Sequence, residues 1–380
     1  MIILGVETSC DETAIAVIKA SKNKIEVLAN VVSSQVELHA KWGGVVPNLA
    51  AREHLKNIIP VFKDALDEAS LKKENIDLVS VTQGPGLMPA LLVGTNFAKT
   101  ISYLWKKPLL GIHHIEGHIY ANFIKTKKVD NEFDIKFPVL ALVVSGGHTQ
   151  LIFMKDHLQY EIVGETQDDA VGEAFDKVAR ILGLGYPGGP VISQLAEKWK
   201  LQKSNVKSYG LKLPRPMLNS SNFNFSFSGL KTAVLYAVKK YREENKLKEE
   251  DSLPKYFVAE VAYEFQEATI EVFVKKTIKV AKEYKPKTII MAGGVSANIE
   301  LNKQIKEAVR SVKFNGVEKV IYISPNTRYS LDNATMIAVA GYYRWKNMSK
   351  KEKKNFLYNW EALQADAGLR LTNLSNNAKI

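Results

Sequence analysis

IILGVETSCDETAIAVIK, residues 2–19, is the stretch of sequence that decides the fold class. Residues 2–7 and 14–19 are short apolar runs typical of strands, and the polar residues 8–13 between them predict a turn. The stretch VLALVVSGGHTQLIFM, residues 139–154, repeats this arrangement, with predicted strands at 139–145 and 149–154. Two strand–turn–strand units that begin about 140 residues apart predict a duplicated fold whose two hairpins face one cleft.

Helical patterns lie between and after these predicted strands. In residues 52–71, apolar side chains recur at three- and four-residue spacing and predict one buried face, made of Leu55, Ile58, Ile59, Phe62, Ala65 and Leu66. Residues 258–284 predict a longer helix, and 288–292 and 320–324 predict further strands. Because strand and helix patterns alternate, the sequence predicts an α/β protein. The polar residues 125–136 predict a connection between two lobes.

The composition of the chain predicts a soluble globular protein. Of its 380 residues, 46% are hydrophobic and 24% are charged, and no apolar run is long enough to span a bilayer, so we expect no membrane association. Cys10 is the single cysteine, which excludes an internal disulfide and a thiolate zinc cluster. The opening MIILGVETSCDE turns acidic too early for a secretory signal, so we expect a cytoplasmic protein.

The charge balance leaves two interpretations open. The chain has 52 Lys and Arg against 40 Asp and Glu, which gives a formal charge of +12. Such a balance attracts polyanions, nucleic acid first among them, but it is also typical of a solvated lysine-rich surface. The same alternative, an RNA grip or a solvated helix face, applies to the basic and aromatic residues near the C-terminus. These are Lys350, Lys351, Lys353, Lys354, Phe356, Tyr358 and Trp360.

The sequence HHIEGH, residues 113–118, contains three of the seven histidines. In a helix, His114 and His118 lie four positions apart on one face, so that one metal ion can contact both imidazoles. Glu116 follows His114 by two positions and points away from that face. A zinc protease of the HExxH type needs its Glu directly after the first His, so the spacing favours a metal site and disfavours a protease. The alternative is that these histidines only pack or cap a helix.

Asp332 is the expected third metal ligand. It follows the predicted strand 320–324 and precedes the apolar helical residues 334–342. An acidic residue at a strand-to-helix junction of an α/β fold faces the cleft. Two histidines and one carboxylate leave positions open for substrate oxygens and suit Fe(II) or Zn(II). The same position also suits an N-cap of the following helix, and spacing alone does not separate the two roles.

Four glycine-containing loops are candidates for nucleotide binding, because glycine lets backbone N–H groups approach a phosphate. They are SGGHT at 145–149, GGVSAN at 293–298, GG at 188–189 and GPG at 84–86. None has the Gly-Lys-Ser/Thr of a Walker A loop, so we expect any nucleotide to be held by glycine loops and acids between the lobes. The acids of residues 166–177 form either an exposed helix face or part of that cleft: Asp168, Asp169, Glu173 and Asp176.

Nine motifs, in one order, resemble the TsaD family over nearly the whole chain to residue 343. They are ETSCDETA at 7–14, GGVVPNLAAREH at 43–54, TQGPGL at 82–87, HHIEGH at 113–118, VSGGHT at 144–149, GEAFDKVARILGLGYPGGP at 172–190, FSFSGLKTAV at 225–234, GGVSAN at 293–298 and the Asp-Asn pair at 332–333. The resemblance implies a two-lobed, duplicated actin/Hsp70/sugar-kinase-like (ASKHA) α/β fold with a central cleft.

The resemblance also implies an activity. A threonylcarbamoyl group passes from threonylcarbamoyl-adenylate to the exocyclic amine of adenosine 37, in tRNAs that read codons beginning with A, and AMP is released. It further implies one divalent metal ion held by His114, His118 and Asp332, with Fe(II) favoured and Zn(II) and Mg(II) as alternatives. Asp11 matches an acid near the reacting centre that either accepts the amine proton or positions the substrate. The positions that match the adenylate site are Ser145, Gly146, Gly147, His148, Thr149, Asp176, Gly189 and Asn298.

Domains and partners follow from the same resemblance, which is closest to the bacterial type. We expect a first lobe at 1–128, a second lobe at 129–343 and a basic tail at 344–380 that packs back on the first lobe. The implied partners, besides tRNA and the adenylate, are an inactive paralogue of the TsaB type and a small ATPase of the TsaE type.

Three positions depart from the family's pattern without touching a metal or adenylate position. Asn48 stands where Glu is usual, Ala51 where Ser is common, and Pro89 where Gly is usual. The alternative function is a metal-dependent ATPase or phosphotransferase on the same fold, which has no need of His114 and His118. A binding subunit with a vestigial pocket is disfavoured by the intact motifs.

Overall fold

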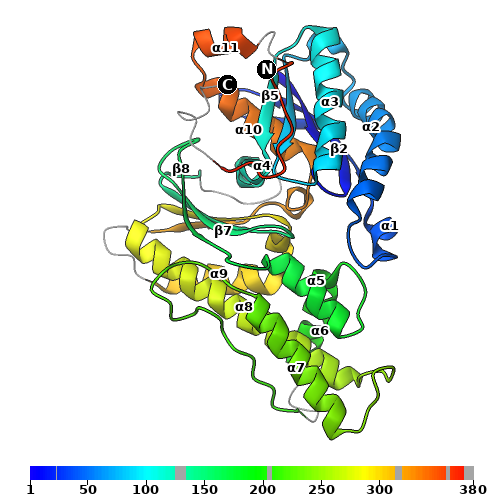
Figure 1. The fold of residues 1–380 in the computed structure, drawn as a ribbon. Helices are drawn as coiled ribbons and strands as arrows, with labels where there is room; N and C mark the ends of the chain where they lie inside the picture. The colour runs from blue at the N-terminus through cyan, green and yellow to red at the C-terminus, as the bar shows by residue number, and fades with distance from the viewer. Residues whose placement is uncertain (23, 125–133, 203–207, 313–318, 357–359, 372–380) are drawn as a thin grey trace.

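The computed structural model describes the chain except residues 23, 125–133, 203–207, 313–318, 357–359 and 372–380 (Figure 1). Two five-stranded sheets carry the architecture, one in each half of the chain. The first has the order β3 (Ile25–Ser34), β2 (Glu12–Ala20), β1 (Ile2–Glu7), β4 (Leu78–Gly84) and β5 (Leu109–His113). The second has the order β8 (Tyr160–Glu165), β7 (Thr149–Met154), β6 (Val139–Val144), β9 (Thr288–Ala292) and β10 (Ile321–Ile323).

The two sheets repeat one topology, which confirms the predicted duplication. β1 pairs antiparallel with β2, with Ile2 opposite Lys19, and parallel with β4. In the second sheet β6 pairs antiparallel with β7, with Val139 opposite Met154, and parallel with β9. The apolar runs form these strands because both faces of each sheet are covered, and all six residues of β6 are buried.

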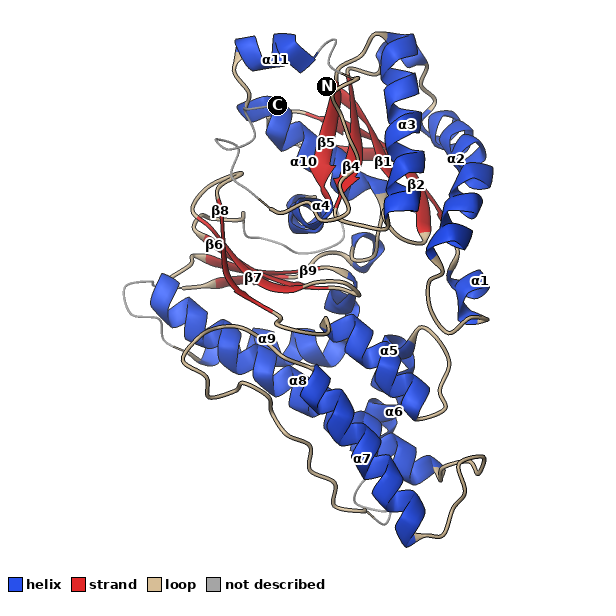
Figure 2. Cartoon of the chain, in the orientation of Figure 1, coloured by secondary structure: helices blue, strands red, loops and turns tan. Residues whose placement is uncertain are grey.

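Helices cover the outer faces and fill the space between the sheets (Figure 2). α2 (Pro47–Ala69) and α3 (Met88–Trp105) pack on the first sheet. On the far side of the second sheet lie α5 (Val171–Ile181), α6 (Gly188–Gln202), α7 (Ser228–Glu244), α8 (Lys255–Tyr284) and α9 (Ile299–Ser311). The shorter helices are α1 (Val36–Ala40), α11 (Lys350–Phe356) and the 3₁₀ turns η1 (Lys73–Asn75), η2 (Ala121–Phe123), η3 (Gly294–Ala297) and η4 (Thr327–Tyr329).

Two helices lie between the sheets, α4 (His114–Tyr120) and α10 (Ala334–Asn347). α4 contacts β5 of the first sheet and β6 and β9 of the second, and α10 packs on β1 and β2. Their side chains share one apolar core with strands of both sheets, including Ile112, Ile115, Val143, Ile290 and Ile337. Because α4 carries two of the candidate metal ligands, its place in this shared core puts those ligands between the lobes.

The buried face of α2 differs from the prediction. The helix begins at Pro47 and buries Ala50, His54, Ile58, Val61 and Ala65, which follow one another at three- and four-residue spacing. Leu55 and Ile59 each stand one position after a buried residue, about 100° around the helix. They are 65% and 60% exposed, so the expectation that they are buried is wrong.

The expected lobes and the tail are joined by contacts that cross their boundaries. The expected boundary between residues 128 and 129 lies outside the described residues, and α10, within the expected second lobe, packs on the first sheet. In the tail, Trp360 and Leu363 pack against the core of the first sheet, and the backbone N–H of Asp366 donates to the carbonyl of Gln83 at 2.9 Å. Among the described residues, no helix combines the length and apolar character needed to cross a membrane.

Candidate functional site

His114, His118 and Asp332 come together between the sheets. One ligand atom from each lies within 4.8 Å of the other two. Nε2 of His114 lies 3.5 Å from Oδ1 of Asp332, and Nε2 of His118 lies 3.1 Å from the same oxygen. Among the described residues, His114, His118 and Asp332 are the cluster of potential ligand side chains close enough together to bind one metal ion.

Local structure explains how each of the three reaches that point. β5 ends at His113 and α4 starts at His114, so His114 and His118 lie one helical turn apart with ring centres 4.6 Å apart. Asp332 precedes α10, whose N-cap is Asn333, because the Asn333 side chain accepts a hydrogen bond from the N–H of Met336. The capping role that the sequence left open for Asp332 therefore belongs to Asn333, and the Asp332 carboxylate is left to face the histidines.

The electrostatics of the group favour a bound cation. Burial opposes a charge on His114, but Asp332 and Glu7 together raise the pKa of its imidazole to about 9. Burial likewise disfavours the charged form of Asp332, yet His114 and His118 hold the pKa of this carboxyl well below its ordinary range. Positive charge between Glu7 and Asp332 is thus stabilised, whether protons or a metal ion supply it.

The donor atoms also fit a metal ion. Among the described residues neither ring nitrogen of the buried His118 has a hydrogen-bond partner, and its Nε2 approaches Asp332 without hydrogen-bond geometry. A buried nitrogen without a partner costs free energy unless something else binds it. Two imidazole nitrogens and one carboxylate form the facial set that binds Fe(II), and they also suit Zn(II).

Glu116 is turned away from these ligands and has a different partner. Its carboxylate is fully buried and forms two hydrogen bonds with Arg344 of α10, at 2.6 and 2.7 Å. A side chain held in this way cannot reach a water molecule bound between His114 and His118. The geometry therefore agrees with the spacing argument against a HExxH-type protease.

The loop that contains Ser145, Gly146, Gly147, His148 and Thr149 is a tight turn between β6 and β7. The N–H of Ser145 donates to the carbonyl of His148 at 2.8 Å, and the hydroxyl of Thr149 accepts from the N–H of Val171 at 2.9 Å. A Cβ added to Gly146 or Gly147 would meet no atom within 4 Å, so open space lies beside their backbone. Burial, followed by the charges of His114 and His118, lowers the pKa of His148 to about 4, so this ring is neutral at pH 7.

The loop at 293–298 lies beside the first one. Gly293 has a φ of +87°, and a Cβ there would stand 2.5 Å from the carbonyl oxygen of Val144, so glycine is required for the approach to β6. The side chain of Asn298 is fully engaged: its Oδ1 caps α9 at the N–H of Leu301, and its Nδ2 donates to Ser193 and Gln266, each at 2.9 Å.

The charge of Asp11, which follows β1, acts on Asp176 of α5. Asp11 is 6% exposed, and its charge contributes, after burial, to the raised pKa of Asp176. Oδ1 of Asp176 accepts from the N–H of Gly188 at 2.7 Å, next to Gly189, where an added Cβ would meet no atom within 4 Å. Burial and then the charges of both aspartates raise the pKa of the Tyr186 phenol. Tyr186 was not singled out in the sequence, since nothing local distinguishes it from a core tyrosine.

The other acids of residues 166–177 have structural partners. Asp168 accepts from the N–H of Phe227 at 2.7 Å at the start of α7. Asp169 pairs with Lys177 and Lys231, each at 2.9 Å, and Glu173 pairs with Lys177 at 2.8 Å. Glu173 alone of these three lies on α5, so neither the exposed helix face nor the cleft describes Asp168 and Asp169.

Aromatic residues of the tail are also engaged within the protein. Phe356 packs against the shared core, and the ring of Trp360 lies 5.1 Å from that of Tyr103. Tyr358 lies outside the described residues. The part of the RNA-grip hypothesis that depends on stacking by Phe356 and Trp360 therefore finds no support in these contacts.

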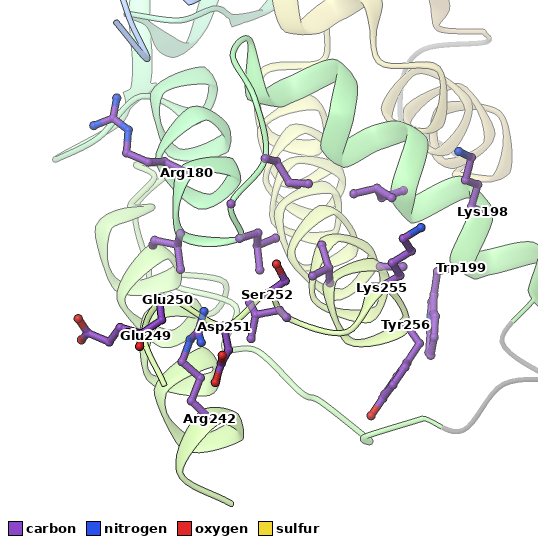
Figure 3. A pocket seen from close by; sticks show the side chains of 18 of the residues that line it. Arg180, Lys198, Trp199, Arg242, Glu249, Glu250, Asp251, Ser252, Lys255 and Tyr256 are labelled. Carbon is purple, nitrogen blue, oxygen red and sulfur yellow. The ribbon is translucent and has the colours of Figure 1, made fainter. Parts of the chain in front are cut away.

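A separate hollow of about 940 Å³ lies among α5, α6, α7 and α8 (Figure 3). Its lining includes the apolar side chains of Leu182, Leu195 and Trp199 together with charged residues of both signs. Arg180 lines this hollow and also donates a hydrogen bond to the carbonyl of Gly43 in the first lobe. None of the expected substrate or metal residues lines it.

His113 connects the tail to the metal-bearing helix and makes the protein sensitive to pH. Its Nδ1 accepts from the N–H of Ile115 at 3.1 Å, and its Nε2 lies 3.0 Å from the carbonyl oxygen of Leu369. Burial, followed by the charge of Arg344, lowers its pKa from 6.5 to about 3. As pH falls below 6.5 the unfolded chain takes up a proton that the folded chain does not, so folding stability is lost on acidification.

This shift predicts a pH-dependent effect of His113→Gln, which keeps a donor for Leu369 but removes the titration. Between pH 7 and 5 the wild-type protein should lose about 2 kcal/mol of stability relative to the variant. Urea denaturation of both proteins across this range measures the difference. A wild-type advantage that stays constant from pH 7 to 5 would show that His113 is not held neutral.

Residues 26–339 match the family model TsaD, described as tRNA N6-adenosine threonylcarbamoyltransferase. A protein of that name from Thermosipho africanus is 47% identical over 346 residues, covering 91% of this chain and 95% of its own. Another from Staphylococcus aureus is 44% identical over 346 residues, covering 91% and 92%.

Among solved structures, full-length HypF in the phosphate- and nucleotide-bound form matches with a TM-score of 0.55 at 11% identity. The match covers 92% of this chain but 47% of HypF, so the chain spans about half the length of that protein. At this identity the likeness shows the fold alone. The fold is of the actin/Hsp70/sugar-kinase type, as the family resemblance implies.

Proposed function

Because the chain belongs to the TsaD family of tRNA N6-adenosine threonylcarbamoyltransferases, we propose that its reaction takes place between the two sheets, at His114, His118 and Asp332. The protein is an enzyme that transfers a threonylcarbamoyl group to N6 of adenosine 37 in tRNA. The observation that carries the location is the convergence of three ligand atoms within 4.8 Å, beside a glycine loop with open space at its backbone.

The proposed donor is threonylcarbamoyl-adenylate, a mixed anhydride that is already activated and needs no covalent nucleophile from the enzyme. The N6 amine forms a bond with the carbamoyl carbon, the bond from that carbon to the phosphate oxygen breaks, and AMP leaves. The amine proton passes to a nearby base. What the site must supply is orientation of a weakly nucleophilic amine and stabilisation of the charge that develops on oxygen.

His114, His118 and Asp332 would hold the divalent metal, which we propose to be Fe(II), with Zn(II) and Mg(II) as alternatives. When bound, such an ion polarises a carbonyl or phosphoryl oxygen and stabilises its developing charge. The open space beside Gly146 and Gly147 supports binding of the adenylate phosphate by their backbone N–H groups. His148, neutral at pH 7, can hydrogen-bond the substrate without adding charge.

The remaining substrate residues divide into two roles. Ser145, Thr149 and Asn298 hold the two glycine loops in shape, since their side chains are bonded to backbone or neighbouring groups. Asp176, on which the charge of Asp11 acts, and Gly189 would contact the nucleoside part of the adenylate. Asp11 either accepts the amine proton or positions the substrate.

The outer surface of α2 and α3 supports a proposal about the protein partner. α2 and α3 pack against each other, with the rings of Phe62 and Phe97 5.2 Å apart, and both expose apolar side chains. Those more than half exposed are Leu55, Ile59, Tyr103 and Leu104. Such a surface supports docking of a protein partner, which we propose to be a paralogue of the TsaB type, with a TsaE-type ATPase in the same assembly. The proposed compartment is the cytoplasm.

Asp11→Asn tests the proposed location of the chemistry. With partners, tRNA and an adenylate-generating system, we expect AMP release and entry of labelled threonine into tRNA to fall together by about a hundredfold, the lower end of what a general base contributes. Asp64→Asn, an exposed acid on α2, serves as the matched control and should keep full activity.

The wild-type enzyme sets the reference for this test. AMP release should require tRNA with adenosine at position 37 and should equal the threonylcarbamoyl groups transferred. Release of AMP at the same rate without tRNA, or full activity of Asp11→Asn, would contradict the proposed site.

A further inference from the structure

Glu7 is a buried carboxylate that the reaction described above does not use. It ends β1, has no exposed surface and lies directly behind His114. Its Oε1 accepts from the N–H of Ser9 at 2.5 Å, and its Oε2 accepts from the hydroxyl of Thr82 at 2.6 Å. Oε2 also lies 3.1 Å from Nδ1 of His114.

Other buried glutamates of this chain have evident structural reasons to be buried. Glu116 pairs with Arg344, and Glu260 accepts hydrogen bonds from the backbone of residues 209–211 and from Ser208. For Glu7, no lysine or arginine among the described residues forms an ion pair within 4.0 Å, and the charged partner that it does have is an imidazole. Burying a carboxylate without a cationic partner costs free energy. The positive charge that compensates Glu7 must therefore be carried by His114 or by a cation bound to it.

The direction of the hydrogen bonds decides what Glu7 does to that ring. A backbone N–H can only donate, so the bond from Ser9 makes the Glu7 carboxylate an acceptor at Oε1. The hydroxyl of Thr82 supplies a second donor at Oε2. A carboxylate engaged in this way accepts a hydrogen bond from Nδ1–H of His114, which leaves Nε2, the nitrogen nearer Asp332, with its lone pair free.

Ser9 alone would not fix the ring in this state. Its hydroxyl lies 3.2 Å from Nδ1 of His114, and a hydroxyl can donate as well as accept. If Ser9 donated to Nδ1, the ring proton would sit on Nε2 and block metal ligation. Glu7 removes that alternative, because the carboxylate only accepts.

We propose that Glu7 is a positioning residue that holds His114 in the tautomer with Nε2 free for metal ligation, and that Thr82 holds Glu7 in place. This inference rests on the proposed metal group of His114, His118 and Asp332. A carboxylate behind a metal-binding histidine fixes the ring orientation and raises its basicity, and loss of such a partner lowers metal affinity by about 10- to 100-fold.

The test is a titration of the metal-free, full-length protein with Co(II), followed by its visible absorption spectrum. Glu7→Gln keeps the shape of the side chain but can place an amide N–H against Nδ1 of His114. We expect it to weaken Co(II) binding about 10- to 100-fold and to change the intensity or position of the Co(II) bands. Thr82→Val should weaken binding in the same direction and less, and Glu7→Asp should recover part of the affinity.

Two further variants make the outcome decisive. Glu260→Gln alters another buried glutamate, on α8, and should leave Co(II) affinity and spectrum unchanged, so a general loss of stability is not mistaken for an effect at the metal. His118→Ala should abolish tight binding. If His118→Ala binds Co(II) like wild type, the metal group itself is wrong and this inference falls with it. If His118→Ala loses binding while both Glu7→Gln and Thr82→Val bind with wild-type affinity and spectrum, the metal group stands and the role of Glu7 is refuted.

Discussion

Replacing both His114 and His118 with alanine is expected to remove stoichiometric metal binding and to slow threonylcarbamoyl transfer by about a thousandfold. The size follows from the several kcal/mol of charge stabilisation that a metal ion contributes in such reactions, at one factor of ten for every 1.36 kcal/mol. Asp332 alone then faces the cleft, and one carboxylate does not hold a divalent ion tightly. Elemental analysis of the purified protein and a single-turnover assay with labelled threonine measure the two effects.

The control for this variant is a histidine outside the group. His157 stacks on Tyr343, with ring centres 4.4 Å apart, and contributes no atom to the metal candidates. His157→Phe should therefore keep both metal content and transfer rate. Equal metal content in the wild type and the double-alanine variant would show that His114 and His118 are not metal ligands. An unchanged transfer rate after loss of the metal would show that the reaction does not need the metal.

The second large effect is expected on folding, from Glu116→Ala. The two hydrogen bonds between Glu116 and Arg344 join α4 to α10, and Arg344 is 9% exposed. Although burial disfavours its charge, Glu116 raises the pKa of Arg344 above its ordinary value, so the guanidinium stays charged. Removing the carboxylate leaves a buried charge without a partner, which costs about 3–5 kcal/mol. Urea denaturation measures the loss.

A paired replacement separates a buried charge from a simple cavity. Glu116→Leu combined with Arg344→Met removes both charges and keeps apolar volume, so it should lose much less stability than Glu116→Ala. If the double variant is as unstable as Glu116→Ala, the loss comes from packing between α4 and α10 and not from the uncompensated guanidinium.

Sequence patterns predicted the parts of this protein that depend on neighbours close in the chain. The two strand–turn–strand units at 2–19 and 139–154 could be read from alternating apolar and polar runs, because a hairpin is formed by adjacent residues. The shared face of His114 and His118, and the opposite direction of Glu116, follow from helix periodicity alone. The glycine loops could be located for the same reason, since a turn needs glycine at particular positions.

Other features required the tertiary structure because they join residues far apart in the sequence. The periodicity of α2 could not show which of two overlapping apolar stripes faces the sheet, so Leu55 and Ile59 were wrongly expected to be buried. The sequence left open whether Asp168 and Asp169 lie on an exposed helix face or in the cleft. In the structure they bind Phe227 and Lys231, which come more than fifty residues later.

The candidate site likewise combines features that local sequence predicts with features that only the tertiary structure shows. By itself the sequence determined a duplicated α/β chain with two histidines on one helical face, because these depend on local periodicity. Only the tertiary structure decided that Asn333, and not Asp332, caps α10, and that Asp332 thereby meets His118. It also brought Glu7 of β1 against His114 of α4, through the parallel pairing of β1, β4 and β5 that sets both strand ends at one edge of the sheet. Strand order is a property of the whole fold, and no short-range pattern carries it.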